Sequence, residues 1–183
     1  MAKRQRIKDG LILKIPTGDG KLSFGKVLSQ TNICVYDYRI DEEHFDAFLL
    51  KDLIKSPILF YVALYEYVIK DGVFEVIANT EVRYEEVLKI PPAFLQDGYT
   101  LECTLYYYEP PREIKVRKEE CIGLEPICVY DHTSVIDRIV AHYNKKKVRF
   151  IERNKVILSK DDPRYCNANI RWDFEKEEYI NDN

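Results

Sequence analysis

Turns built from aspartate and glycine punctuate this chain, and the residues between them alternate in polarity. The turns are expected at Asp9-Gly10, Gly18-Asp19-Gly20, Asp71-Gly72 and Asp97-Gly98. Glycine readily adopts the left-handed backbone that such turns need. The intervening apolar residues recur with period two, which is typical of half-buried strands. We therefore expect strands over 11–16, 24–28, 33–38 and 99–108.

Two further features refine the strand pattern. The segment from Ile58 to Ile69 is largely apolar on both faces, which predicts a long central strand that is covered on both sides. Gly25 interrupts the apolar run of its own strand. It therefore predicts a bulge, or a close approach by a neighbouring backbone.

Two stretches follow a helical period instead. In the first, Asp41 is the expected N-cap and Pro57 the stop, and the apolar positions are Phe45, Phe48, Leu49 and Leu53. In the second, Ser134 and Asp137 give a cap-like start, and the apolar stripe is Val135, Ile136, Ile139, Val140 and Tyr143. Beyond it, residues 148–151 and 156–158 predict a hairpin that turns at Arg153-Asn154.

These elements predict a mainly β fold of the α+β class. We expect an antiparallel, partly barrel-like, twisted sheet with one or two helices packed on it. No long linker or low-complexity stretch separates the halves, so residues 1–160 are expected to form a single domain. Residues 161–183 would be a C-terminal extension that is acidic at its end, with five acids and one base from Asp173 onward.

Charge and hydropathy argue against two classes of protein. Lysine and arginine number 28 and aspartate and glutamate 31, so the net charge of −3 does not favour nucleic-acid binding through the overall field. The longest apolar run, Ile58 to Tyr65, is too short to span a bilayer. The basic start of the chain is not followed by the apolar stretch of a signal peptide. We therefore expect a cytoplasmic protein.

The sequence lacks the spacing of a familiar catalytic or metal centre. His44, His132 and His142 do not complete a zinc site with Cys128. The five cysteines have no CxxC spacing, so buried thiols are expected in a reducing compartment. Adjacent acids such as those at 85–86 would point to opposite faces of a strand. We expect no catalytic residue, no metal and no cofactor, and hence no enzyme.

Two alternatives stay open on the sequence alone. The segment from Arg138 to Lys155 interleaves basic residues with Tyr143 and Phe150, a combination that can bind RNA. A nucleic-acid-binding or regulatory β domain would use this segment. A small hydrolase, such as a ribonuclease, would instead need the histidines or a carboxylate pair to converge in one cleft.

Tyrosine is unusually frequent, with 14 residues against 8 phenylalanines and 1 tryptophan. Tyr38, Tyr106 and Tyr108 fall on the more polar faces of their expected strands. Tyrosine combines a large contact area with a polar tip, which suits protein interfaces as well as half-buried sheet positions. These three residues are candidate anchors for a protein partner.

Two groups of motifs resemble a known family. The first group is Asp9-Gly10-Leu11-Ile12-Leu13-Lys14-Ile15-Pro16, Gly18-Asp19-Gly20, Phe24-Gly25-Lys26-Val27-Leu28 and Cys34-Val35-Tyr36-Asp37. The second is Glu120-Cys121-Ile122-Gly123-Leu124-Glu125, Cys128-Val129-Tyr130 and Val135-Ile136-Asp137-Arg138-Ile139 with His142-Tyr143. They resemble the opening and closing regions of the immunity protein 26 family. The two groups mark the ends of a stretch from residue 7 to about residue 143. The family's usual Gly-Asp start is reversed here, and Tyr36 and Tyr130 stand where Trp or Phe is expected.

The resemblance implies a mostly β protein of bacterial polymorphic toxin systems. Such a protein neutralises a cognate toxin domain, encoded nearby, by binding it, and the resemblance implies neither catalysis nor a cofactor. The family motifs do not identify the residues that touch the toxin. An acidic surface associates quickly with a basic partner, so the exposed start of the first expected helix supplies the candidate partner-binding residues Asp41, Glu42, Glu43 and Asp46.

Overall fold

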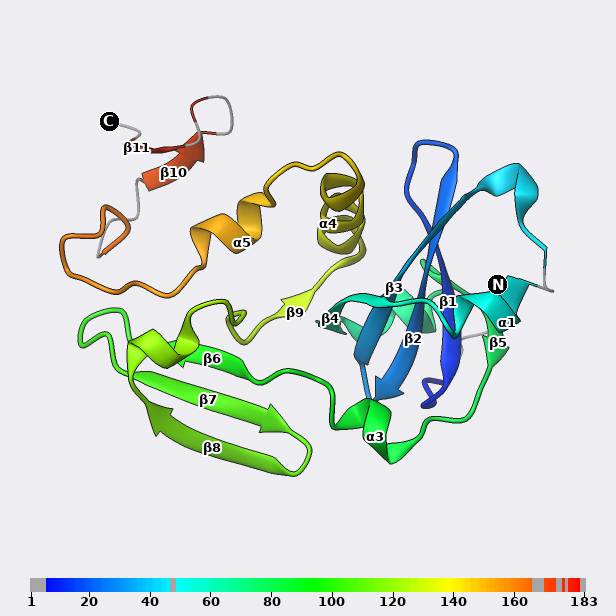
Figure 1. The fold of residues 1–183 in the computed structure, drawn as a ribbon, viewed down its shortest axis with the longest axis horizontal. Helices are drawn as coiled ribbons and strands as arrows, with labels where there is room; N and C mark the ends of the chain where they lie inside the picture. Colours follow the sequence, from blue (N-terminus) through cyan, green and yellow to red (C-terminus); the bar gives the residue numbers. More distant parts are fainter. Residues whose placement is uncertain (1–5, 47–48, 166–169, 174–175, 177, 182–183) are drawn as a thin grey trace. The chain divides into compact units, whose positions relative to one another are not determined.

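The structure is a computed structural model that describes residues 6–46, 49–165, 170–173, 176 and 178–181 (Figure 1). The chain forms two compact units. Unit 1 comprises Met1–Lys89 and Cys128–Asn144, and unit 2 comprises Ile90–Ile127 and Lys145–Asn183. Two compact units of one chain can still unfold as one cooperative domain. The expected single domain over 1–160, with an extension over 161–183, therefore stays a prediction.

Unit 1 is built on an open six-stranded sheet. Its strands are β1 (Leu11–Pro16), β2 (Lys21–Ser29), β3 (Asn32–Asp41), β4 (Ile58–Leu64), β5 (Glu75–Asn79) and β9 (Val129–Tyr130). They lie in the order β5-β1-β2-β3-β4-β9, and only the pairing of β4 with β9 is parallel. The mainly β, α+β class and the first three expected strands are confirmed. The sheet does not close into a barrel, because β5 and β9 are its two edges.

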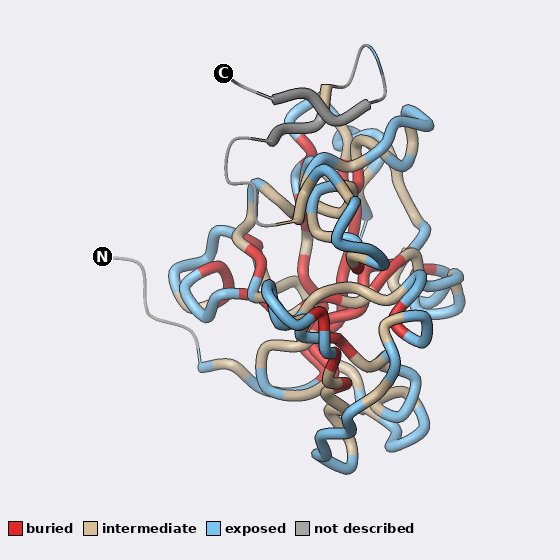
Figure 2. The backbone as a smooth tube through the Cα atoms, turned by 90° about the vertical axis from the view of Figure 1, so that its left-hand side faces the viewer, coloured by how far each residue is buried: buried red, intermediate tan, exposed pale blue. Residues whose placement is uncertain are grey.

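Short helices lie between and after the strands of this sheet. They are α1 (Leu50–Leu53), α2 (Glu66–Lys70), α3 (Tyr84–Val87), α4 (His132–Tyr143) and the 3-10 turn η1 (Glu42–His44). Seven consecutive residues of β2, Leu22 to Leu28, are buried, which requires cover on both faces. Figure 2 shows the buried residues gathered inside the molecule and the exposed ones on the outer loops. Of the helices described, none has the length and apolar character needed to cross a membrane.

Gly25 is needed where β2 approaches β3. The pairing of the two strands shifts register between Ser23 and Gly25, which confirms the expected bulge. A Cβ atom on Gly25 would lie 3.1 Å from the carbonyl oxygen of Cys34. The close backbone approach that the sequence predicted is therefore also present, and glycine permits it.

The long strand expected over 58–69 is wrong in its second half. β4 ends at Leu64, and α2 begins at Glu66 after Tyr65 in the N-cap position. Lys70 forms an ion pair with Glu66 one helical turn earlier, a spacing that favours helix. β4 is also not central, because its neighbour on one side is only the two-residue β9.

The two expected helices differ from their predictions at their starts. After Asp41 the chain forms η1 and later α1 instead of one helix, and Phe48 lies outside the described residues. Asp41 makes no side-chain cap bond, because its carboxylate binds Lys21 at 2.5 Å. In α4 the cap is Asp131, whose carboxylate accepts a 2.7 Å hydrogen bond from the backbone N–H of Ser134. Ser134 is therefore the donor to the cap rather than the cap itself.

Unit 2 contains a smaller sheet and a separate strand pair. Its elements are β6 (Ala93–Gln96), β7 (Cys103–Tyr108), β8 (Pro111–Val116), η3 (Lys118–Cys121), α5 (Arg149–Arg153), β10 (Ile170–Asp173) and β11 (Glu178–Asn181). The strands pair in the orders β6-β7-β8 and β10-β11, all antiparallel. The hairpin expected over 148–158 is wrong, because α5 occupies its first half. The strand expected over 99–108 starts only at Cys103, since Asp97 accepts backbone hydrogen bonds from Tyr99 and Thr100 and holds a turn.

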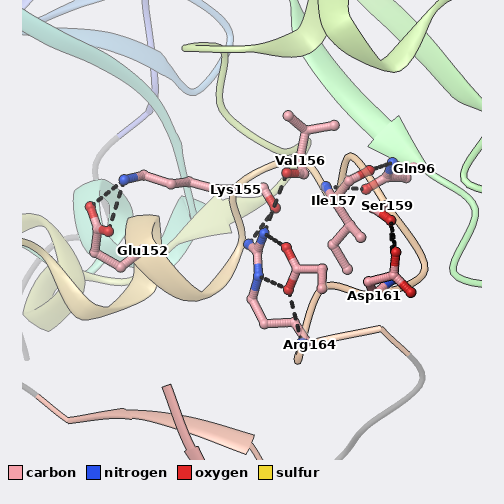
Figure 3. A network of polar contacts seen from close by, with 9 residues as sticks. Gln96, Glu152, Lys155, Val156, Ile157, Ser159, Asp161 and Arg164 are labelled. Atoms are coloured by element: carbon pink, nitrogen blue, oxygen red, sulfur yellow. Dashed lines mark hydrogen bonds and ion pairs between the residues drawn. The ribbon is translucent and has the colours of Figure 1, made fainter. Parts of the chain in front are cut away.

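Side-chain hydrogen bonds hold the loop after α5, residues 155–164, in unit 2. The main buried cluster is small and contains Phe94, Cys103, Leu105, Cys121 and Val156. The Gln96 amide both donates to the carbonyl and accepts from the N–H of Ile157, each at 2.8 Å (Figure 3). The Arg164 guanidinium binds Asp162 and donates to the carbonyl oxygen of Lys155 at 2.7 Å. The segment from 155 to 164 is therefore held by these polar contacts together with the buried Val156.

Candidate interaction site

The four predicted acidic contact residues lie together at the end of β3 in unit 1. Asp41 is the last residue of β3, Glu42 and Glu43 open η1, and Asp46 follows shortly after. All four are exposed to solvent. We refer to residues 41–46 as the acidic segment. It presents four carboxylates within six residues, so it is a locally negative surface even though the whole chain carries only −3.

Neighbouring strands fix the start of the acidic segment. Lys21 of β2 faces Asp41 of β3 in the strand register, and its ammonium group lies 2.5 Å from the carboxylate. This hydrogen bond and the lysine charge lower the pKa of Asp41. His44 lies 3.8 Å from Asp41 and 3.9 Å from Glu43. The segment thus keeps more acidic than basic groups, and its first carboxylate is held in place.

Arg39, the base nearest to the acidic segment along β3, adds little positive charge to the surface. Its side chain is only 10% exposed and binds the Asp19 carboxylate and the Thr17 hydroxyl. The hydrogen bond from Thr17 and the arginine beside it lower the pKa of Asp19. The guanidinium carbon also lies 4.9 Å from the centre of the Tyr143 ring, and the hydroxyl of Tyr143 donates to Asp37 at 2.9 Å. Arg39 is therefore neutralised by its own neighbours.

The three candidate tyrosines are divided between the units. Tyr38 is half-buried on β3 of unit 1, with its ring 5.9 Å from that of Phe24. Tyr106 and Tyr108 are half-buried on β7 of unit 2. The acidic segment and Tyr38 therefore share one compact unit, and Tyr106 and Tyr108 belong to the other. A contact role for all of these residues stays a prediction.

The histidines have separate partners. His132 and His142 stand at opposite ends of α4, and ten residues of helix correspond to about 15 Å. His132 lies edge-on to Tyr67, and His142 lies 3.8 Å from Asp37. Within the part of the chain that the structure describes, no group of three histidine, cysteine, aspartate or glutamate side chains is arranged to hold a metal ion. The converging histidines that a hydrolase would need are not formed by this pair.

The cysteines that the structure describes are buried or half-buried. Cys34, Cys103 and Cys121 are buried, Cys128 is intermediate, and Cys166 lies outside the described residues. Burial raises the pKa of the Cys34 thiol to about 11 and that of Cys121 to about 12. Both therefore remain protonated thiols at neutral pH. For Cys34, Cys103 and Cys121 the predicted burial is confirmed.

The basic segment that suggested nucleic-acid binding is divided between the two units. Its first part lies on α4 in unit 1, and the residues from Lys145 onward belong to unit 2. Arg138 packs on the ring of Phe60, with its guanidinium carbon 3.9 Å from the ring centre. Tyr143 is engaged with Asp37 and Arg39. The contacts of these residues support packing rather than RNA binding.

Two stacked tyrosines are exposed within the range 58–69, where a strand was expected. Tyr65 and Tyr67 are 50% and 39% exposed, and their rings stack 6.1 Å apart at an angle of 26°. They reach the surface because the chain leaves β4 and turns into α2 at this point. The spacing of Glu66 and Lys70 could have indicated that helix.

Comparison with known proteins identifies the family. Residues 8–103 match the sequence profile of the family described as Immunity protein 26. The motifs that resemble the family's closing region, residues 120–143, lie outside this match. Neither the curated proteins nor the solved structures include a match. Because the matched range covers just over half of the 183 residues and runs from β1 to the start of β7, the chain belongs to the immunity protein 26 family.

Proposed function

We propose that this protein binds a toxin domain encoded beside its own gene and neutralises it by covering the toxin's active site. It would act in the bacterial cytoplasm, with no cofactor and no chemical turnover of its own. The observation that carries the proposal is that the family match over 8–103 includes the whole acidic segment. The proposal thus assigns the family's role in immunity to a defined surface of this chain.

The chemistry of the acidic segment favours a basic partner. A toxin that acts on nucleic acids needs basic residues to hold the phosphates of its substrate. Four exposed carboxylates at the end of β3 would meet such a surface and compete with those phosphates. Opposite charges also speed association, which matters for a protein that must bind its toxin before the toxin acts.

Tyrosines would supply the less polar part of the contact. Energetic anchors in interfaces are enriched in aromatic residues, and Tyr38 lies on the same strand as Asp41. We propose Tyr38 as the anchor beside the acidic segment. Tyr106 and Tyr108 are proposed as anchors that unit 2 contributes.

Binding to the neighbouring gene product tests this function directly. The full chain should bind the purified product and protect cells that express it. The triple variant Glu42→Gln, Glu43→Gln and Asp46→Asn should lower the association rate by about tenfold or more at low salt. This loss should shrink as salt increases, because salt screens exposed charges. The rates can be measured by surface plasmon resonance at several salt concentrations.

A matched variant separates local charge from net charge. Glu81→Gln, Glu85→Gln and Glu119→Gln also remove three exposed carboxylates, but from parts of the chain that hold none of the proposed contact residues. This control should keep the association rate of the unmodified protein. Equal losses in both variants would contradict a specific role for the acidic segment. A neighbouring product that neither binds nor harms unprotected cells would contradict the proposed function itself.

A further inference from the structure

Unit 1 carries an open hollow where β4 ends, on residues that the acidic segment does not include. Its volume is about 410 Å³, within the range of roughly 300–1,000 Å³ that is usual for ligand pockets. Four parts of the chain meet there: the segment before β1, the β2–β3 turn, the β4–α2 junction and β9. The lining residues that matter are Asp9, Gln30, Leu64, Tyr65, Glu66 and Val129.

Backbone hydrogen bonds hold the walls of the hollow in place. The N–H of Leu64 donates to the carbonyl of Thr31, and that of Tyr65 donates to the carbonyl of Tyr130, both at 3.0 Å. The N–H of Gln30 donates to Asp9 Oδ1 at 3.2 Å. The strands, the β2–β3 turn and the segment before β1 are thereby tied together. The hollow is therefore formed before any ligand arrives, which lowers the entropy that binding must offset.

The lining has the chemistry of a site for a cation. It contains two carboxylates, Asp9 and Glu66, and no lysine or arginine. Gln30 binds Oδ1 of Asp9, and Lys70 binds Oε2 of Glu66. One oxygen of each carboxylate is thus already engaged, and both residues line the same hollow. A ligand with several N–H donors would have two carboxylates to bind, and it would have to compete with Lys70 at Glu66.

Tyr65 adds an aromatic face to the acidic lining. It is 50% exposed and is stacked on Tyr67, whose hydroxyl lies 3.4 Å from Nδ1 of His132 at the start of α4. His132 thus contacts Tyr67, the tyrosine on which Tyr65 stacks. A cation over a tyrosine ring is attracted by the negative face of the ring. The floor beside it is apolar, with Leu64 and the 48% exposed Val129, and suits the methylene groups of a long side chain.

We propose that this hollow binds an arginine side chain presented by the toxin partner. The guanidinium stacks on Tyr65 and donates to Asp9 and Glu66, and its stem lies against Leu64 and Val129. Arginine fits better than lysine, because a planar guanidinium can stack and donate in two directions at once. The identity of the partner rests on the proposed function, whereas the chemistry of the hollow does not.

The hollow can be tested without any toxin. The full chain is titrated with N-acetyl-arginine methylamide, and in parallel with the citrulline analogue, which has the same shape but no charge. Amide NMR should show saturable shifts at Gln30, Tyr65, Glu66 and Val129 with the arginine compound alone. Equal shifts with both compounds, or shifts that lie elsewhere, would overturn the proposal.

Variants define which groups bind the cation. Asp9→Asn combined with Glu66→Gln should weaken binding of the arginine compound about tenfold, as expected for lost hydrogen bonds to charged groups. Tyr65→Leu should weaken it about threefold, since it keeps apolar bulk but removes the ring. Glu85→Gln, an exposed acid on α3, is the control and should leave binding unchanged. A well-dispersed amide spectrum shows that each variant is folded, and an Asp9/Glu66 variant that still binds normally refutes the site.

The toxin experiment then separates the two proposals. If the neighbouring product binds, the Asp9/Glu66 and Tyr65 variants should speed its dissociation, and unchanged dissociation would overturn the role of the hollow while leaving the immunity function intact. If the product does not bind at all, the proposed function fails. The arginine titration still decides the chemistry of the hollow in that case.

Discussion

The two units bury their sheets to very different extents. In unit 1, seven consecutive residues of β2 are buried, and its sheet has cover on both faces. In unit 2, five of the six residues of β8 are exposed, and the buried residues form one small cluster around Phe94 and Leu105. Burial of apolar surface supplies most of the free energy that stabilises a fold. Unit 1 should therefore tolerate the loss of a side chain that unit 2 cannot.

The polar contacts of the units differ in the same way. Unit 1 buries Lys26 within β2 and pairs it with Glu86 on α3, so that the ion pair is part of the core. In unit 2, Gln96 and Arg164 bind backbone groups of a loop that has little apolar cover. In unit 1 the buried polar groups are hydrogen-bonded inside a large apolar core. In unit 2 hydrogen bonds hold a loop that has only a small apolar core beneath it. This difference predicts where each unit is most sensitive to substitution.

The largest difference between the units is expected from the same truncation made in each. Phe94→Ala should cost about 3–5 kcal/mol, which is comparable to the whole contribution of a core this small. Amides in β6, β7 and β8 should lose protection, and those in β1 to β4 should keep it. Hydrogen exchange followed by mass spectrometry resolves the two sets of peptides.

Phe24→Ala in unit 1 is the matched control. Phe24 is 1% exposed and Phe94 is 3% exposed, so both substitutions empty a buried ring site. Unit 1 should remain folded with reduced protection. If either substitution unfolds both units together, the comparison fails. The chain would then behave as the single domain over 1–160 that the sequence predicted.

The buried ion pair of unit 1 gives the next largest effect. Lys26 is 4% exposed, and its ammonium donates to the Glu81 carbonyl at 2.7 Å and to Glu86 at 3.0 Å. Glu86→Ala leaves this charge buried without its counter-ion, so the free energy of unfolding of unit 1 should fall by about 3 kcal/mol. Urea unfolding, read from the protection of β2 amides, measures the loss.

A double variant tests the physical reason. Lys26→Met with Glu86→Leu removes both charges and keeps apolar volume, so its stability should lie within about 1 kcal/mol of the unmodified protein. A double variant as unstable as Glu86→Ala would show that the packing of the glutamate chain, rather than the unpaired charge, is what matters.

The Lys26–Glu86 ion pair shows which features of the fold could be predicted from the sequence and which could not. The alternating pattern predicted the strand over 24–28 that contains Lys26, and that strand is confirmed. Glu86 lies sixty residues away, and the local pattern does not indicate that it returns to this lysine. Turns and strands follow from short-range chemistry and were predicted. Contacts that depend on the path of the whole chain were not.

The same limit applies to the candidate site. The exposure of Asp41, Glu42, Glu43 and Asp46 follows from a local run of charge and was predictable. The hollow was not, because it needs β9 to pair beside β4 after a long excursion of the chain through unit 2. Tyr65 was assigned to a strand because an apolar run continues through the point where α2 begins.

In unit 2, loss of a single amide side chain should have a clear but local effect. Gln96→Ala removes both hydrogen bonds to Ile157 and leaves half-buried backbone groups unpaired, which should cost about 1–3 kcal/mol. Amide exchange should accelerate in residues 155–158, with β7 less affected. Leu95→Ala, at an exposed position of the same strand, is the control and should change exchange little. Equal effects of the two substitutions would show that Gln96 does not fasten this loop.

The smallest expected effect on stability comes from a helix cap. In unit 1, α4 has a side-chain cap, whereas α5 in unit 2 has none. Asp131→Ala should lower the stability of α4 by about 1 kcal/mol. The hydrogen bond from the Ser134 N–H lowers the pKa of Asp131, so folding favours the ionised carboxylate. The stabilisation is therefore present above the unfolded pKa of about 3.9 and is lost as the pH falls through the folded value.

Replacing the cap by asparagine isolates this charge. Asp131→Asn still accepts from Ser134 but does not titrate, so α4 should lose less protection in acid than it does with aspartate. Amide exchange of Val135 and Ile139, corrected for the intrinsic effect of pH, provides the measurement. The two proteins should diverge only below about pH 4, because above it the aspartate is ionised in both the folded and the unfolded chain. Identical acid profiles for aspartate and asparagine would mean that the cap acts through its hydrogen bond alone, and α4 would then gain no more from charge than the uncapped α5.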